Sequence, residues 1–163
     1  MASNPYAPPK AAVADIAGAR IPPRLWNPNA AANWSLLFGP AFGAFLHMKN
    51  WQALEEPAKA SAAKVWFLLT IVVLGSLVCA SVVLPQSRQL AGSVRIVGFL
   101  LLLAWYFGSA RGQAAYVKTQ LGDTYPRRGW SKPLGLAVLA LFALIAVMTM
   151  TAVVLRSVVA TSG

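Results

Sequence analysis

Long apolar stretches without a charged residue alternate with short polar connections along this chain. Three such stretches, Val65–Leu84, Ile96–Ala110 and Leu134–Leu155, contain 20, 15 and 22 residues. A helix rises about 1.5 Å per residue, so about 20 apolar residues cross a hydrocarbon core of about 30 Å. The middle stretch is short, but Arg95 and Arg111 at its edges can snorkel and extend it. The pattern predicts three membrane-spanning helices, over residues 65–84, 94–110 and 134–155.

A fourth apolar segment, Trp34–Leu46, has only 13 residues and contains Gly39-Pro40. Proline removes one helix hydrogen bond and kinks the axis, and 13 residues suit an interfacial or re-entrant segment better than a span. On one helix, its aromatic residues would lie close to a single face, as in a helix on a membrane surface: Trp34, Phe38, Phe42 and Phe45. We expect a kinked interfacial or re-entrant helix over residues 28–54, and the sequence leaves open whether it spans.

Capping and breaking residues set the expected helix ends. Asn27-Pro28, Glu55-Glu56-Pro57 and Ser131-Lys132-Pro133 are typical helix starts. Pro85 ends the first span, and the short connection that follows predicts antiparallel packing with the second span. The second helix is expected to continue beyond the membrane to Leu121, and the last span to end near Leu155. Gly122 can then provide a left-handed stop.

The N-terminal residues read as a tail. Residues 1–25 are rich in proline, and too little apolar surface is present to offset the entropy of ordering. We therefore divide the chain into a disordered cytoplasmic tail over residues 1–25 and a membrane domain over residues 26–163. The tail can also be interpreted as a docking peptide, because polyproline segments bind aromatic grooves.

Composition supports a membrane protein. The chain has 163 residues, of which 58% are hydrophobic and 11% charged, whereas a soluble domain carries about 25% charged residues. The 14 basic and 4 acidic residues give a net charge of +10. The basic residues flank apolar runs instead of lining one face, so the lipid bilayer is the expected partner and nucleic acid is not. Arg127, Arg128 and Lys132 are the candidate contacts for anionic lipid.

Basic residues also predict the orientation. If Trp34–Leu46 does not cross the membrane, 11 basic residues lie on one side and 3 on the other; if it crosses, the split is 8 to 6. The minority in the first case are Arg88, Arg95 and Arg156. Because positive charge accumulates on the cytoplasmic side, the three-span arrangement is favoured. It places the N-terminus in the cytoplasm and the C-terminus in the periplasm.

Groups for catalysis are sparse. The uncharged cores of the spans hold no Asp, Glu, Lys or His, which weakens a proton-coupled transporter. The single histidine, His47, is expected to be an interfacial polar residue, and the single cysteine, Cys79, a small packing residue. The four acidic residues are spread over loops. We therefore predict no enzymatic activity, no catalytic residue, no cofactor and no metal site.

Small residues at four-residue spacing are better placed for a role. They occur on three segments: Gly39 with Pro40 and Gly43, Gly75 with Cys79, and Ala104 with Gly108 and Gly112. In lipid, such residues let helices approach closely. The contacts can be between helices of this chain, with a second copy, or with a partner protein.

The opening Asn4-Pro5-Tyr6-Ala7-Pro8-Pro9-Lys10 resembles the leader of a group of small bacterial inner-membrane proteins with no known activity. The stretch from Trp26 to Phe38 and the residues Asn50-Trp51-Gln52-Ala53-Leu54 resemble a pattern in the same group. The resemblance covers about a quarter of the chain. It implies a location in the bacterial inner membrane and transfers no catalytic residue.

Two functional hypotheses follow from these observations. The first is a non-enzymatic membrane component, accessory or immunity-type, that acts through helix–helix contacts with a membrane protein or with copies of itself. The alternative is an oligomeric small transporter or channel in which the Gly39-Pro40 segment is a re-entrant gate. The sequence names no ligand, partner or oligomeric state.

Overall fold

The structure is a computed structural model that describes residues 21–83 and 88–162 of the chain. It is all-helical, as the sequence predicts. The elements are α1 (Pro28–Phe38), α2 (Pro40–Ala53), α3 (Pro57–Val83), α4 (Arg88–Trp105), the π-helical turn η1 (Tyr106–Ala110), α5 (Arg111–Leu121) and α6 (Ser131–Ser162). Most of the predicted N-terminal tail lies outside the described residues.

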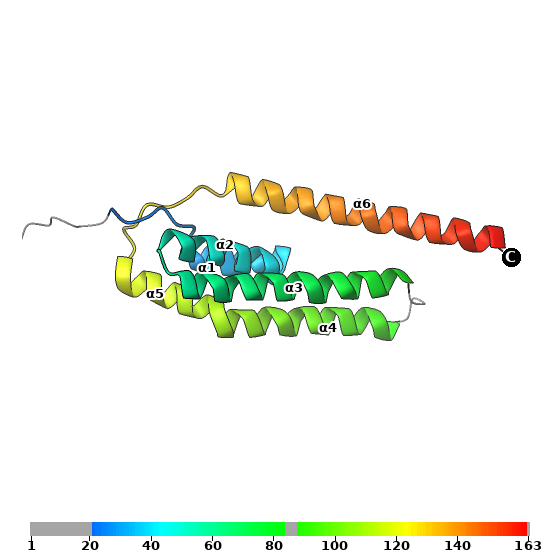
Figure 1. Ribbon diagram of the computed structural model, residues 1–163, viewed down its shortest axis with the longest axis horizontal. Coiled ribbons are helices and arrows are strands. Elements are labelled where there is room, and N and C mark those ends of the chain that lie inside the picture. The colour runs from blue at the N-terminus through cyan, green and yellow to red at the C-terminus, as the bar shows by residue number, and fades with distance from the viewer. Residues whose placement is uncertain (1–20, 84–87, 163) are drawn as a thin grey trace, which may run out of the picture.

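Three helical stretches are long and apolar enough to cross a membrane, and they correspond to the three predicted spans. They cover Pro57–Ala80, Gly92–Leu121 and Ser131–Val154. The chain is therefore a multi-pass membrane protein. The helices α3 and α4 lie side by side, and α4 runs through η1 into α5, which ends at Leu121 before the positive-φ Gly122 as expected (Figure 1). The last helix extends past the predicted end at Leu155, to Ser162.

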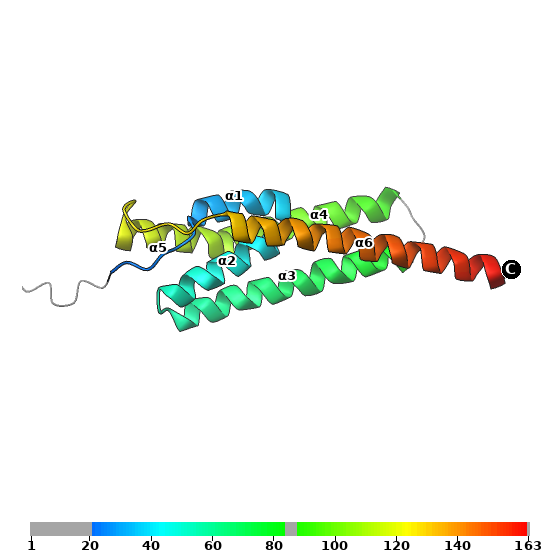
Figure 2. The same ribbon diagram turned by 90° about the horizontal axis from the view of Figure 1, so that it is seen from above.

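The segment over residues 28–54 differs from the expected kinked helix. Gly39, with φ 81° and ψ 166°, ends α1 and begins α2. The two helices run in opposite directions, so that the start of α1 and the end of α2 lie at the same end of the molecule (Figures 1 and 2). The segment is a helical hairpin that enters the bundle and returns, which corresponds to the re-entrant form of the prediction. The prediction that the aromatic residues share one face of a single helix is consequently wrong.

The second helix of the hairpin, α2, forms the centre of the protein. Eight of the fourteen residues of α2 are buried: Pro40, Gly43, Ala44, Leu46, His47, Met48, Asn50 and Trp51. The spans are much less buried. In the most apolar stretch of each span, 11% is buried in the first span, 11% in the second and none in the third. Lipid must therefore cover the spans, whereas α2 is covered largely by the chain itself. The helix α1 lies further out, and Leu36 and Leu37 on it are 72% and 71% exposed.

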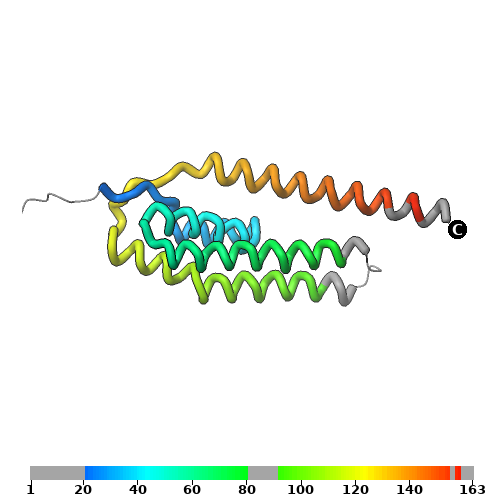
Figure 3. The backbone as a smooth tube through the Cα atoms, in the orientation of Figure 1, coloured from blue at the N-terminus to red at the C-terminus, as the bar shows by residue number. Residues whose placement is uncertain are grey.

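The helix α6 lies at the side of the bundle, separated from the other helices along much of its length, and makes a few contacts with α3 (Figure 3). No residue from position 134 to position 154 is buried. Its attachment is at its N-terminal end, where Leu25 forms an isolated bridge with Arg127 in the loop before the helix. Leu25 is itself fully buried against Val117 and Tyr125.

Candidate functional site

The turn of the hairpin reaches the middle of the first span. A side chain at Gly39 would lie 4.0 Å from Leu74 Cδ1, and Leu74 is near the centre of α3. The positive φ of Gly39 is a conformation that L-residues rarely adopt, and Pro40 occupies the first turn of α2, where no helix hydrogen bond is lost. Glycine and proline together therefore create a reversal at this depth and not the kink that proline alone suggests.

Gly43 lies where the hairpin meets α4. A Cβ atom at Gly43 would overlap with the hydroxyl of Ser35 and with the indole of Trp105. Trp105 is fully buried and packs beside Ala44 and Ala110. The glycine thus allows an indole ring to fit against the backbone of α2.

Buried polar side chains join the hairpin to α5. The amide nitrogen of Asn50 donates to the carbonyl of Trp26 at 2.8 Å and to Oε1 of Gln113 at 3.2 Å, while Asn50 Oδ1 accepts from the Trp26 amide at 3.0 Å. Gln113 Nε2 donates to the carbonyl of His47 at 2.9 Å. We call His47, Asn50 and Gln113 the polar cluster. All three are at most 1% exposed.

The π-helical turn η1 aligns the residues that contact the hairpin. Trp105 and Gln113 are eight residues apart, which in a regular α-helix of about 3.6 residues per turn would separate them by about 80°. A π turn closes its hydrogen bond one residue later and contains about one extra residue. Trp105, Ala110, Gln113 and Val117 can therefore all face the hairpin, and all four are buried.

Two buried polar atoms of this site have no hydrogen-bond partner. They are His47 Nδ1 and Trp105 Nε1, and the two rings meet edge to face with centroids 5.3 Å apart. His47 lies in α2, outside the three spans; burial lowers its pKa to about 4, against the opposing effect of its contact with the Pro28 carbonyl. The ring is consequently neutral at pH 7. Nε2 lies 3.3 Å from that carbonyl and must carry the proton, which leaves Nδ1 as an acceptor.

His47, which the sequence suggests is an interfacial polar residue, is therefore buried inside the protein, while its depth in the membrane stays a prediction. A histidine on a short helix with aromatic neighbours is typical of the membrane–water interface. The reversal at Gly39 instead folds that helix into the protein. The sequence assigns no role to Gln113, and it includes Asn50 only in the stretch that resembles other small membrane proteins. Their signal is weak, because a lone amide in an apolar context has no characteristic spacing.

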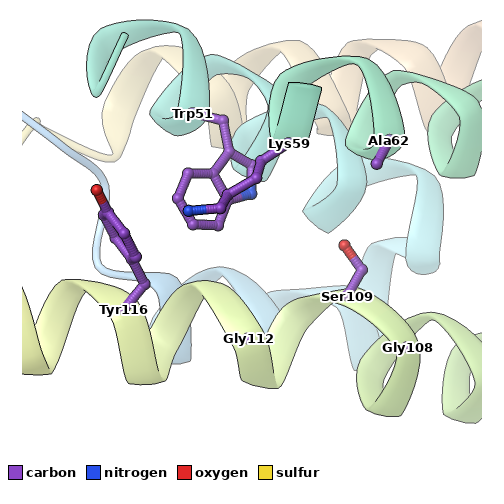
Figure 4. A pocket seen from close by; sticks show the side chains of 7 residues that line it. All are labelled: Trp51, Lys59, Ala62, Gly108, Ser109, Gly112 and Tyr116. Carbon is purple, nitrogen blue, oxygen red and sulfur yellow. The ribbon is translucent and has the colours of Figure 1, made fainter. Parts of the chain in front are cut away.

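A second group of interacting side chains lies at the start of α3. Lys59 Nζ is 4.9 Å from the ring centroid of Trp51 and 4.1 Å from that of Tyr116, and it pairs with Glu56 Oε1 at 3.3 Å. The hydroxyl of Tyr116 donates to the same carboxylate oxygen at 2.8 Å. Lys59 is thus held between two aromatic rings, as the close view shows (Figure 4).

The predicted packing residues occupy two kinds of environment. Gly39 and Gly43 lie at contacts within the chain, and a Cβ at Gly108 would lie 3.0 Å from the Trp66 ring. Around Gly75 and Gly112 there is open space. Cys79 and Ala104 are exposed on α3 and α4.

The predicted lipid contacts lie in or next to the loop before α6. Arg127 and Lys132 are exposed and Arg128 is half-buried. The Arg128 guanidinium stacks 4.7 Å from the ring centroid of Trp26, whose indole donates to the Gly129 carbonyl at 3.0 Å. The Arg127 guanidinium lies 5.8 Å from the ring centroid of Tyr125. The aromatic rings therefore fix both guanidinium groups at one end of the bundle.

Within the described part of the chain, no group of three or more His, Cys, Asp or Glu side chains is arranged to hold a metal ion. No protein-family model, curated protein or solved structure matches the chain.

Proposed function

We propose that this protein is a non-enzymatic accessory component of the bacterial inner membrane that binds a membrane partner through α6. The observation that carries the proposal is the sparse packing of this helix: from position 134 to position 154 no residue is buried, and the helix makes only a few contacts with α3. In lipid, helices associate through packing and not through hydrophobicity, so an apolar helix that its own chain leaves uncovered is available to a partner. An immunity-type role, in which the partner is a membrane-targeting toxin, uses the same surface.

The rest of the structure supports a distinction between a packed body and a partner-binding helix. The hairpin and its polar cluster make a compact body with α3, α4 and α5, and the bridge between Leu25 and Arg127 fixes the start of α6 to that body. The glycine at position 75 and the cysteine at position 79 leave a second small-residue surface on α3.

Co-purification in a mild detergent tests the proposal. The wild-type chain is expected to bring down a defined membrane protein or a second copy of itself. A variant in which residues 134–154 are replaced by polyleucine of the same length should still insert, because the helix remains long and apolar, but it should lose the partner. A wild-type chain that stays alone and monomeric in several mild detergents, or a polyleucine variant that keeps its partner, contradicts the proposal.

The alternative function, an oligomeric transporter or channel, is favoured by one observation. The hairpin reverses at Gly39-Pro40 beside Leu74, and broken helices at membrane depth form the substrate sites of several transporter folds. Flux through reconstituted vesicles, compared between the wild type and Pro40→Ala, tests this idea. Absent flux in the wild type, or equal flux in both proteins, argues against a gate.

A further inference from the structure

A groove runs between α3 and the η1–α5 helix, with the side chain of Lys59 at its end (Figure 4). Its volume is about 240 Å³, and its walls are formed by Trp51, Lys59, Ala62, Gly108, Ser109, Gly112 and Tyr116. The side chain of Lys59 is 44% exposed. The groove therefore combines an accessible ammonium group with a floor of small residues.

Polarity changes along the groove in the direction of the membrane. Lys59 and Tyr116 lie at the basic end of the bundle, next to the loop residues that precede α3. Ser109 lies about two turns deeper along the helix, and Ala62 and Gly108 line the same deeper part. From the surface inward, the groove thus offers a cation, then a hydroxyl, then an apolar wall.

This order matches the chemistry of a glycerophospholipid. We propose that the groove binds one phospholipid, whose phosphodiester contacts Lys59, whose ester carbonyl accepts from the Ser109 hydroxyl, and whose acyl chain lies over Ala62 and Gly108. The inference goes beyond the proposed subunit function and does not depend on which partner α6 binds.

Lys59 is paired with Glu56 but keeps N–H donors for a second, anionic partner. An ammonium group has three N–H donors, and Glu56 takes one of them from Lys59. The aromatic rings of Trp51 and Tyr116 hold the ammonium in place, so little side-chain freedom is lost when the phosphate arrives. Among the described residues, no protein group forms a hydrogen bond with the Ser109 hydroxyl.

Gly112 keeps the groove open. No heavy atom lies within 4 Å of the position that its Cβ would occupy, although Gly112 is part of the groove wall. A Cβ at this position would meet no neighbouring atom, so we expect a leucine here to extend into the groove. Gly75 on α3 also has open space around it but lies outside the groove, and it is the matched control.

The binding of dioleoylphosphatidylglycerol to the full chain in detergent, followed by native mass spectrometry, tests the proposal. One lipid is expected to stay bound to the wild type. Gly112→Leu and Lys59→Met should each raise the dissociation constant at least about tenfold, as expected for loss of the space or of a charge-assisted contact. Gly75→Leu should bind like the wild type, and so should Lys64→Met, which changes an exposed lysine of α3 outside the groove.

Two further probes identify which part of the ligand is recognised. Dioleoylglycerol, which has the same chains and no phosphate, should bind much more weakly, and inorganic phosphate should not displace the phospholipid. Equal binding of dioleoylglycerol, displacement by inorganic phosphate, wild-type binding by Gly112→Leu, or an equal loss in Lys64→Met would overturn the proposal.

Discussion

Individual glycine and amide residues determine how the hairpin packs. The glycines could be identified from the sequence, whereas the amides could not. Gly39 and Gly43 were visible as small residues next to proline, because that combination is unusual in an apolar segment. Their partners, Trp105 and Leu74, could not be predicted, since they are far away in the chain and lie within long uncharged stretches. The polar cluster was missed because amide side chains leave no periodic pattern.

Substitution of Gly43 by alanine is expected to destabilise the protein by about 1–3 kcal/mol, because the added methyl group overlaps with buried Trp105. The intrinsic helix preference of alanine, about 1 kcal/mol, acts in the opposite direction. Gly75→Ala, which meets open space, should keep or raise stability. Thermal unfolding in detergent, followed by circular dichroism, compares the variants, and equal melting temperatures would argue against the close approach.

Gln113→Leu should destabilise the protein by about 1–3 kcal/mol, because it leaves a buried carbonyl of His47 without a donor and removes a partner of Asn50. The control is Gln120→Leu on the same helix, where the side chain is exposed. Chemical unfolding of both variants in the same detergent measures the difference. A Gln113→Leu protein as stable as its control would show that the cluster adds nothing.

The Glu56 carboxylate, just outside the first span, gives stability a dependence on acid pH. The hydroxyl of Tyr116, and next the ammonium of Lys59, lower the pKa of Glu56 below its ordinary value of about 4.5. A lowered pKa in the folded state stabilises the fold fully above about pH 4.5, and this contribution is lost as the pH falls through the lowered value.

Melting temperatures measured from pH 6 to pH 3 should therefore fall more steeply for the wild type than for Tyr116→Phe. The control, Tyr106→Phe, changes a tyrosine that is 39% exposed. Its profile should follow the wild type. Parallel profiles for all three proteins would remove Glu56 from the explanation.

At the scale of the elements, the sequence predicted helices and their ends better than their directions. The cap at Asn27-Pro28 and the stop at Gly122 lie where expected, because capping is local chemistry. The reversal at Gly39 depends on a positive φ, which residues other than glycine disfavour. A glycine also adopts negative φ values, so its presence in the sequence does not predict the reversal. The π turn has no sequence signal, since its extra residue is favoured only by the contacts on either side.

The π turn predicts an unusual tolerance to deletion. Removing Phe107, which is 61% exposed, should convert η1 into regular α-helix and leave Trp105 and Gln113 seven residues apart, again close to one face. Removing Ala115, also exposed, should rotate Val117 away from Gln113 by about 100°. We expect the first variant to unfold close to the wild-type temperature and the second well below it, as measured by thermal unfolding in detergent.

At the scale of the whole molecule, the length of the apolar stretches predicted the three spans. The thickness of the bilayer sets this length, because a helix needs about 20 apolar residues to cross it whatever it packs against. The number of charges on each side then favoured a Trp34–Leu46 segment that does not cross. The structure places Leu25 beside Arg127, so the residues before α1 and the loop before α6 lie at one end of the bundle. Which end faces the cytoplasm is a matter of charge alone.

The orientation makes a prediction for reporter fusions. Alkaline phosphatase joined after Gly163 should be active, because it would reach the periplasm, and a green fluorescent protein at the same position should be dark. The same two reporters joined within the 122–130 loop should give the opposite pattern. An active cytoplasmic reporter at Gly163 would reverse the orientation.

The hairpin also gives the molecule a larger cross-section in one leaflet of the bilayer than in the other. Because α1 and α2 enter from one end and turn near the centre of α3, each adds a helix diameter of about 10 Å to one leaflet and nothing to the other. Such a wedge-shaped body displaces more lipid on its broad side. Many copies gathered in one patch would therefore be expected to favour a bilayer that is curved toward the narrow side.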